Sequence, residues 1–167
     1  MKYSKEEISS NIIVPPSVEI ELKRLIENKL DQTGIFYRVF SRTKSPASLE
    51  RKYFQKEYNE DKKIQDLIGI RINLYFQDDI KIVKQLMDNL FIGLEWAENK
   101  IDTTSFEPTK INGVFKLPSY LVAKISEQTW EMAIDQTFEI QLKTVFFEGW
   151  HEVEHDMRYK QDRKSVV

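Results

Sequence analysis

The order of apolar and polar residues along the chain predicts helices that alternate with strands. Helices are expected at residues 17–30, 46–58, 79–90 and 145–160. Pro16 precedes the first of them, Ser45 suits the N-cap of the second, and Asp78 suits the N-cap of the third. Residues 1–14 are mixed in character, and we expect them to be frayed or to depend on a partner.

Strands are expected at residues 35–42, 67–76 and 94–99, at residues 113–125 with an interruption at Pro118, and from residue 138 onward. The last of these alternates strictly. Its apolar face carries Phe138, Ile140 and Leu142, and its polar face carries Glu139, Gln141 and Lys143. Helices and strands in this order predict an α/β (α+β) fold, a mixed sheet with helices packed on it.

Composition narrows the class of protein. The chain has 167 residues, enough for one domain with a sizeable core, and its 41% apolar content is typical of a globular protein. A net charge of −2 means that any anion site is built locally. The absence of cysteine excludes disulfides, thiolate zinc sites and a cysteine nucleophile. Without a signal peptide or a long apolar run, we expect a cytoplasmic protein that makes no membrane contact.

Three polar clusters are candidates for chemistry. Arg42, Lys44 and Ser45 stand where a strand passes into a helix, and Lys52 lies two turns further on. Cations beside a helix N-terminus suit an anion such as phosphate. The alternative for this cluster is a solvated basic turn.

The second cluster begins with Asp66, at the head of the most apolar strand, and continues with Gly69 and Arg71. A glycine inside a strand often marks the close approach of another group, and a guanidinium plane stacks on a base or pairs with phosphate. The alternative for Asp66 is a turn cap. The third cluster is the row of Glu139, Gln141 and Lys143, for which the alternative is an ordinary amphipathic strand.

Together the clusters predict a magnesium-dependent enzyme that acts on a nucleoside triphosphate. Asp66 and Glu139 are two carboxylates that hold Mg²⁺ when substrate phosphates supply its other ligands. Arg42, Lys44 and Lys52 are cations that stabilise the charge of a transferring phosphoryl group.

A zinc-protease motif also occurs, since residues 151–155 read His-Glu-Val-Glu-His. Catalytic zinc takes three protein ligands. The chain has no third histidine and only twelve residues after His155. The zinc reading is therefore disfavoured.

Three ordered segments, RTKSPASLERK, DLIGIRI and FEIQLKT…GWHEVEHDMRYK, carry a resemblance to a known family. The chain resembles the synthetase domain of the RelA/SpoT alarmone enzymes, and is most similar to the small alarmone synthetases, which include toxic members. The resemblance implies a nucleotidyltransferase-like fold and transfer of pyrophosphate from ATP to the 3′-hydroxyl of GDP or GTP, the (p)ppGpp synthesis of the stringent response. It divides the chain into an N-terminal helical segment, residues 1–33, a synthetase domain, residues 34–160, and a tail, residues 161–167.

Residue by residue, the resemblance implies that Arg42 and Arg71 sandwich adenine and that Lys44 and Lys52, next to Ser45, bind phosphate. Asp66 corresponds to the main Mg²⁺ ligand, and Glu139 to the second acid, which binds metal or takes the proton of the attacking hydroxyl. The acceptor residues that it implies are Asn112, Phe115, Gln141, Lys143 and His155. The family has a guanine-stacking tyrosine where this chain has Val114, and a histidine where it has Pro118.

The departure at Val114 and Pro118 leaves three functions open. They are synthesis of (p)ppGpp, transfer by a toxic relative to tRNA 3′ ends or adenine nucleotides, and nucleotide sensing without catalysis. The partners expected are ATP, a nucleotide or tRNA acceptor, and a second copy, a regulatory domain or an antitoxin. The short tail after residue 160 suggests a piece of a longer protein, with a regulatory region beyond it.

Overall fold

The computed structural model describes residues 4–56, 58, 62–98 and 111–145. Its centre is a five-stranded sheet in the order β1-β2-β5-β4-β3. The strands are β1 (Tyr37–Thr43), β2 (Ile68–Leu74), β3 (Gly93–Glu98), β4 (Ile111–Lys116) and β5 (Thr137–Thr144). Strands β2 and β5 pair in parallel, and the other neighbours pair antiparallel. The predicted fold class, a mixed sheet with helices packed on it, is confirmed.

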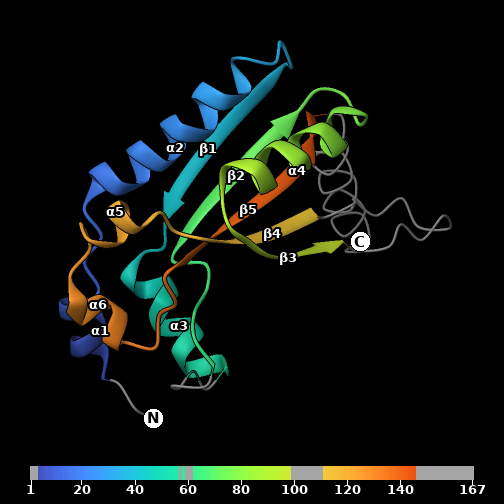
Figure 1. Cartoon of the computed structure of the whole chain (residues 1–167). Helices are drawn as coiled ribbons and strands as arrows, with labels where there is room; N and C mark the ends of the chain where they lie inside the picture. Colours follow the sequence, from blue (N-terminus) through green and yellow to red (C-terminus); the bar gives the residue numbers. More distant parts are fainter. Residues whose placement is uncertain (1–3, 57, 59–61, 99–110, 146–167) are drawn as a thin grey trace, which may run out of the picture.

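The helices are α1 (Lys5–Asn11), α2 (Pro16–Leu30), α3 (Pro46–Lys56), α4 (Asp79–Leu90), α5 (Ser119–Val122) and α6 (Glu127–Glu131). Helix α2 runs along β1 (Figure 1), and α4 contacts α2. The apolar stripe of α2 and the buried Val83 and Met87 of α4 join one core with the apolar rows of β2 and β5. Because the apolar rows of β2 and β5 are buried on one face of the sheet, the alternate residues of these strands lie on the opposite face, which carries the polar side chains.

Residues 4–14 are ordered, which corrects for this part the expectation that residues 1–14 fray or depend on a partner. Ser4 and Glu7 form a reciprocal capping box that starts α1. Ile8 and Ile12 are buried in the core. The hydroxyl of Thr129 donates a hydrogen bond to the carbonyl of Asn11 at 3.0 Å and accepts one from the N–H of Ile13 at 3.2 Å. Ile8 and Ile12 pack against residues that are distant in the sequence, so the sequence of this segment alone does not predict their burial.

Two further expectations about elements were wrong in part. The strand expected at residues 113–125 ends at Lys116, because Pro118 begins the short helix α5 and its carbonyl accepts from the N–H groups of Leu121 and Val122. Residues 127–131 form the short helix α6, where the sequence pattern predicted no helix. Asp78 precedes α4 but makes no side-chain capping hydrogen bond. The helix expected at residues 145–160 lies, after residue 145, outside the described residues.

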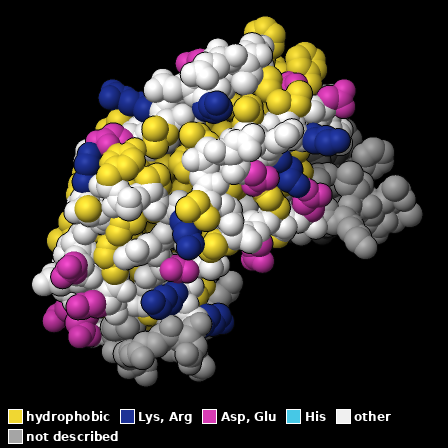
Figure 2. All heavy atoms as spheres, in the orientation of Figure 1, with side chains coloured by type: hydrophobic (Ala, Val, Ile, Leu, Met, Phe, Trp, Pro, Cys, Tyr) yellow, Lys and Arg dark blue, Asp and Glu magenta, His cyan; other side chains and the backbone are white. Residues whose placement is uncertain are grey.

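Figure 2 shows basic and acidic side chains interspersed over the face that it presents, between apolar patches. This mixture agrees with the small net charge of −2 and gives that face no extended field of one sign. Among the described residues, no helix is long and apolar enough to cross a membrane.

Candidate functional site

Strand register places the candidate residues in two rows across the polar face of the sheet. In the first row, Arg42 pairs with Gly69, Gly69 with Glu139, and Glu139 with Val114. In the second row, Phe40 pairs with Arg71, Arg71 with Gln141, and Gln141 with Asn112. Paired residues of neighbouring strands project from the same face. Segments that are far apart in the sequence therefore meet on one surface.

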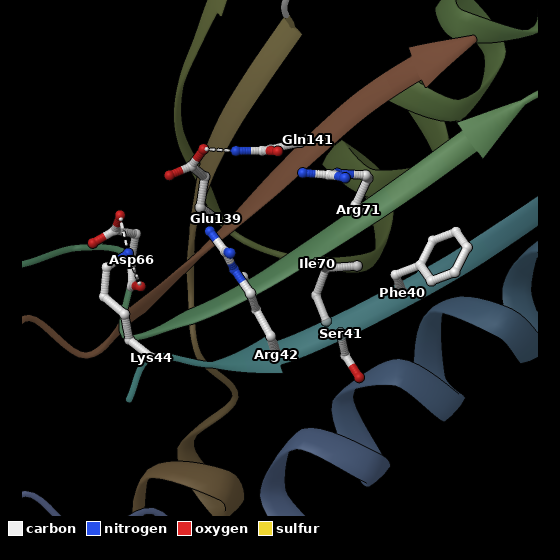
Figure 3. Close-up of a pocket in the computed structure, with 10 residues that line it drawn as sticks. Phe40, Ser41, Arg42, Lys44, Asp66, Ile70, Arg71, Glu139 and Gln141 are labelled. Atoms are coloured by element: carbon white, nitrogen blue, oxygen red, sulfur yellow. Dashed lines mark hydrogen bonds and ion pairs between the residues drawn. The ribbon is translucent and has the colours of Figure 1, made fainter. Parts of the chain in front are cut away.

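A cavity of about 200 Å³ lies over these rows. Its lining residues are Phe40, Ser41, Arg42, Lys44, Asp66, Gly69, Ile70, Arg71, Glu139 and Gln141 (Figure 3). Six of them were expected at the site from the sequence: Arg42, Lys44, Asp66, Arg71, Glu139 and Gln141. The volume is below the roughly 300–1,000 Å³ of a pocket for a drug-sized ligand. The cavity therefore suits one part of a nucleotide, with the remainder outside it.

Asp66 is held by two lysines at one end of the cavity. The Lys52 Nζ lies 2.7 Å from both carboxylate oxygens, and the Lys44 Nζ lies 2.8 Å from Oδ2. The side chain of Asp66 is 20% exposed. Burial opposes ionisation of the carboxyl, but the hydrogen bonds and charges of Lys44 and Lys52 outweigh it, so the pKa of Asp66 lies below its usual range. Asp66 is therefore ionised at neutral pH, as a metal ligand must be.

Local structure explains how these three residues meet. The N–H of Lys44 donates to the carbonyl of Leu67 at 2.8 Å, which extends the pairing of β1 and β2 by one step beyond Thr43. Helix α3 then begins at Pro46, where Ser45 accepts hydrogen bonds from the N–H of Ser48. This role of Ser45 at the helix start is structural, and Ser45 lies outside the lining of the cavity. The helix carries Lys52 back over Asp66.

Glu139 lies on β5 beside an open position. Its Oε1 accepts a hydrogen bond from Nε2 of Gln141 at 3.0 Å (Figure 3). A Cβ atom added to the neighbouring Gly69 would meet only the Cγ of Arg42, at 4.0 Å. The glycine thus leaves space above the sheet, between Arg42 and Glu139. The close approach of another group to this glycine, expected from the sequence, stays a prediction.

The expected acceptor residues divide into four groups. Gln141 lines the cavity, and Asn112 lies beside it in the same row. Lys143 is on the same face one step further along β5, outside the lining residues. Phe115 was assigned wrongly: its side chain is 0% exposed and faces the opposite side of the sheet. His155 lies outside the described residues.

Phe115 belongs to the core because β4 alternates like any strand. Its ring lies 5.2 Å from that of Trp96 and 5.8 Å from that of Phe138, centroid to centroid. A Cβ at Gly113 would come within 2.7 Å of both the Phe115 and the Trp96 rings. Glycine at position 113 therefore makes room for this aromatic packing. The residue that β4 presents beside Glu139 on the polar face is Val114.

Phe40 is a site residue that the sequence analysis missed. It lines the cavity and is 52% exposed. The sequence could have indicated this residue, because Phe40 stands two positions before Arg42 on the same strand and therefore shares its face. An aromatic residue between Arg38 and Arg42 on one face of a strand is the feature that would have identified it.

The residues present fit a magnesium ion that shares its ligands with a substrate. Within the described ranges, no group of three His, Cys, Asp or Glu side chains could hold a metal alone. Asp66 and Glu139 line the same cavity and supply hard oxygen ligands, the type that Mg²⁺ prefers. Phosphate oxygens and water would complete the coordination. Both oxygens of Asp66 accept from lysines in this structure, so metal binding requires these contacts to rearrange.

The chain is similar to known proteins in both sequence and structure. The model of the family described as "Region found in RelA / SpoT proteins" matches residues 41–164. A GTP pyrophosphokinase of Bacillus subtilis (strain 168), YjbM, is 28% identical over 141 residues, which is 83% of this chain. The chain spans 64% of the length of that relative.

Solved structures of the small alarmone synthetase 1 from Bacillus subtilis have the same fold. The structure bound to its product pppGpp has a TM-score of 0.58 at 23% identity, covering 87% of this chain and 74% of that one. The structure bound to AMPCPP has a TM-score of 0.54 at 23% identity, covering 88% and 73%.

Proposed function

The chain belongs to the family of the region found in RelA / SpoT proteins, and on this premise we propose that it is an ATP-dependent pyrophosphokinase. The observation that supports the proposal most strongly is the cavity itself. It combines two arginines, a lysine-bound ionised aspartate and a second acid on one face of the sheet. The similar proteins named above are a GTP pyrophosphokinase and an alarmone synthetase that binds pppGpp and AMPCPP.

In the proposed reaction, a 3′-hydroxyl oxygen of the acceptor attacks the β-phosphorus of ATP. The bond from that phosphorus to the oxygen bridging the α- and β-phosphates breaks, and AMP leaves. The hydroxyl proton passes to the carboxylate of Glu139, whose hydrogen bond from Gln141 orients it. A bound Mg²⁺ supplies positive charge to the phosphates. Because Lys44 and Lys52 both contact Asp66, they stabilise the charge that develops at this end of the cavity.

The lysines have two partners in this scheme. In this structure, Lys44 and Lys52 neutralise Asp66. The triphosphate is a stronger competitor for ammonium groups than one carboxylate, because it carries several charges and more acceptor oxygens. We propose that ATP draws the lysines onto its phosphates and so exposes the oxygens of Asp66 to the metal.

ATP binding is expected to depend on Arg42 and Arg71. Removing one guanidinium plane from a stacked base costs about 1–3 kcal/mol by analogy with stacking on aromatic side chains. Calorimetric titration of ATP into Arg42→Ala and Arg71→Ala should therefore show weaker binding in both. Arg51→Ala is the matched control, because Arg51 is exposed on α3 away from the cavity. Unchanged affinity in both cavity variants would refute the base sandwich.

The acceptor half of the reaction departs from the family pattern, because Val114 stands beside Glu139 where the family has tyrosine. We expect weak transfer to free GDP or GTP, or transfer to a different 3′-hydroxyl. Labelled ATP with Mg²⁺ and a panel of GDP, GTP, ADP, ATP and deacylated tRNA measures this directly. Strong transfer to tRNA would identify a toxic relative. No transfer to any acceptor, with ATP bound normally, would favour a nucleotide-sensing domain.

The same panel tests the reason for the expected preference. Val114→Tyr places a ring on the polar face next to Glu139. We expect the rate of transfer to guanine nucleotides to rise, because stacking on the ring stabilises the bound acceptor by up to about 1–3 kcal/mol. Val114→Leu is the control that adds bulk without a flat face. Strong (p)ppGpp synthesis by the unmodified chain would show that guanine is held without a ring at this position.

A further inference from the structure

The base slot is the space between Arg42 and Arg71 in which the base of the donor nucleotide would stack. We propose that Phe40 and Arg71 together form one wall of this slot. This two-part wall makes the donor site prefer a two-ring base over a one-ring base. The inference rests on the proposed function, since it concerns how the donor nucleotide is recognised. Phe40 lines the cavity together with Arg42 and Arg71.

The spacing of the two rows fits a single flat base. Phe40 and Arg42 are two residues apart on β1, and Gly69 and Arg71 are two residues apart on β2. Two residues of a strand span about 6.6–6.8 Å. Stacked bases lie about 3.4 Å apart. A base standing between the rows therefore contacts Arg42 on one side and the row of Phe40 and Arg71 on the other.

Gly69 makes the slot accessible. It occupies the row of Arg42, and the space that its side chain would take is bounded only by the Cγ of Arg42, at 4.0 Å. A base can therefore reach down to the backbone of β2 at this point. Any larger residue would project into the slot.

The wall opposite Arg42 has two parts that lie side by side. Phe40 and Arg71 are paired residues on adjacent strands, and such strands run about 4.7–4.9 Å apart. In Figure 3, Arg71 lies between the ring of Phe40 and Glu139. A purine has two fused rings and can cover both parts of this wall, whereas a pyrimidine covers one. The second ring of a purine thus gains a contact that a pyrimidine lacks.

The exposure of Phe40 supports a ligand contact. Its side chain is 52% exposed on a face whose neighbouring positions are Arg38, Arg42 and Arg71, and it lies outside the buried core. A flat aromatic surface exposed at the margin of a cavity is available for stacking, and stacking on such a surface favours a base over a sugar or a phosphate.

The test is calorimetric titration of ATP and of CTP, each with Mg²⁺, into the full chain and its variants. Phe40→Ala is expected to weaken ATP binding about tenfold and to change CTP binding by less than about twofold. Phe40→Leu keeps the apolar bulk without the flat ring and should behave like Phe40→Ala. Phe40→Tyr keeps the ring and should restore the preference for ATP.

Phe76→Ala serves as the matched control, because Phe76 is 60% exposed and lies outside the lining of the cavity. It should bind ATP and CTP like the unmodified chain, and circular dichroism should show native folding in every variant. Equal losses of ATP and CTP binding in Phe40→Ala, or no loss of either, would overturn the inference.

The two proposals fail in different ways. If ATP does not bind the unmodified folded chain, the proposed function fails and the role of Phe40 fails with it. If Arg71→Ala loses ATP binding and Phe40→Ala keeps both the affinity for ATP and the preference over CTP, only the role of Phe40 is refuted.

Discussion

Replacing Asp66 with asparagine, or Glu139 with glutamine, is expected to lower the rate of pyrophosphate transfer about 100-fold or more, equivalent to ~3 kcal/mol of transition-state stabilisation. Each substitution keeps the size of the side chain and removes its charge. Asp66 would lose its strength as a metal ligand, and Glu139 would lose its capacity to accept the proton of the attacking hydroxyl. Single-turnover assays with labelled ATP, Mg²⁺ and the best acceptor measure the effect.

The two acids differ in what else they do. Asp66 is mostly buried between Lys44 and Lys52, so Asp66→Asn also leaves two ammonium groups without their anion and is expected to lower stability. Glu139 accepts a hydrogen bond from the neutral amide of Gln141, so Glu139→Gln is the cleaner variant. Glu95→Gln is the matched control, since Glu95 is an exposed acid beside Val114 and outside the cavity. Turnover close to that of the unmodified chain in a folded Glu139→Gln variant would remove Glu139 from the reaction.

Replacing Phe115 with alanine is expected to lower the free energy of unfolding by about 3–5 kcal/mol. The ring is 0% exposed and packs against Phe91, Trp96 and Phe138. Its removal takes apolar contacts from both neighbouring strands and leaves a cavity that the sheet backbone cannot close.

Urea denaturation of Phe115→Ala checks this result, and Val114→Ala is its control. Val114 is the next residue on the same strand and faces the other side of the sheet, so its truncation should cost about 1 kcal/mol or less. If Phe115→Ala kept its stability and lost only the transfer to the acceptor, Phe115 would be an acceptor-binding residue after all. The expected result would instead confirm that Phe115 acts through the core.

Several features of this protein could be predicted from the sequence because they depend on local pattern. Strict alternation in residues 138–143 separates a core row from a polar row, and the structure buries the apolar row. The apolar period of α2 places Val18, Leu22 and Ile26 in the core. The acids, the arginines and Lys44 could be chosen because their residue types suit phosphate and metal chemistry, and because the three motifs match a family in order and spacing.

What the local pattern could not supply is the partner of each residue. Asp66 and Lys52 are fourteen residues apart, and only the path of α3 over the start of β2 brings their charges together. The burial of Ile8 and Ile12 likewise depends on distant core residues. Pro118 was read as an interruption of a strand, yet it begins a helix, because the carbonyl of Pro118 finds its donors in the residues that follow.

The sequence by itself therefore determined the residue types of the site, the fold class and the two faces of its best strand. Only the tertiary structure decided which strands are neighbours, and thus that Arg42, Gly69 and Glu139 form one row while Phe40, Arg71 and Gln141 form the next. The physical reason is that alternation along one strand sets which face a side chain occupies, whereas its neighbours across the sheet depend on strand order and register. These follow from how the apolar rows of all the strands pack beneath the helices.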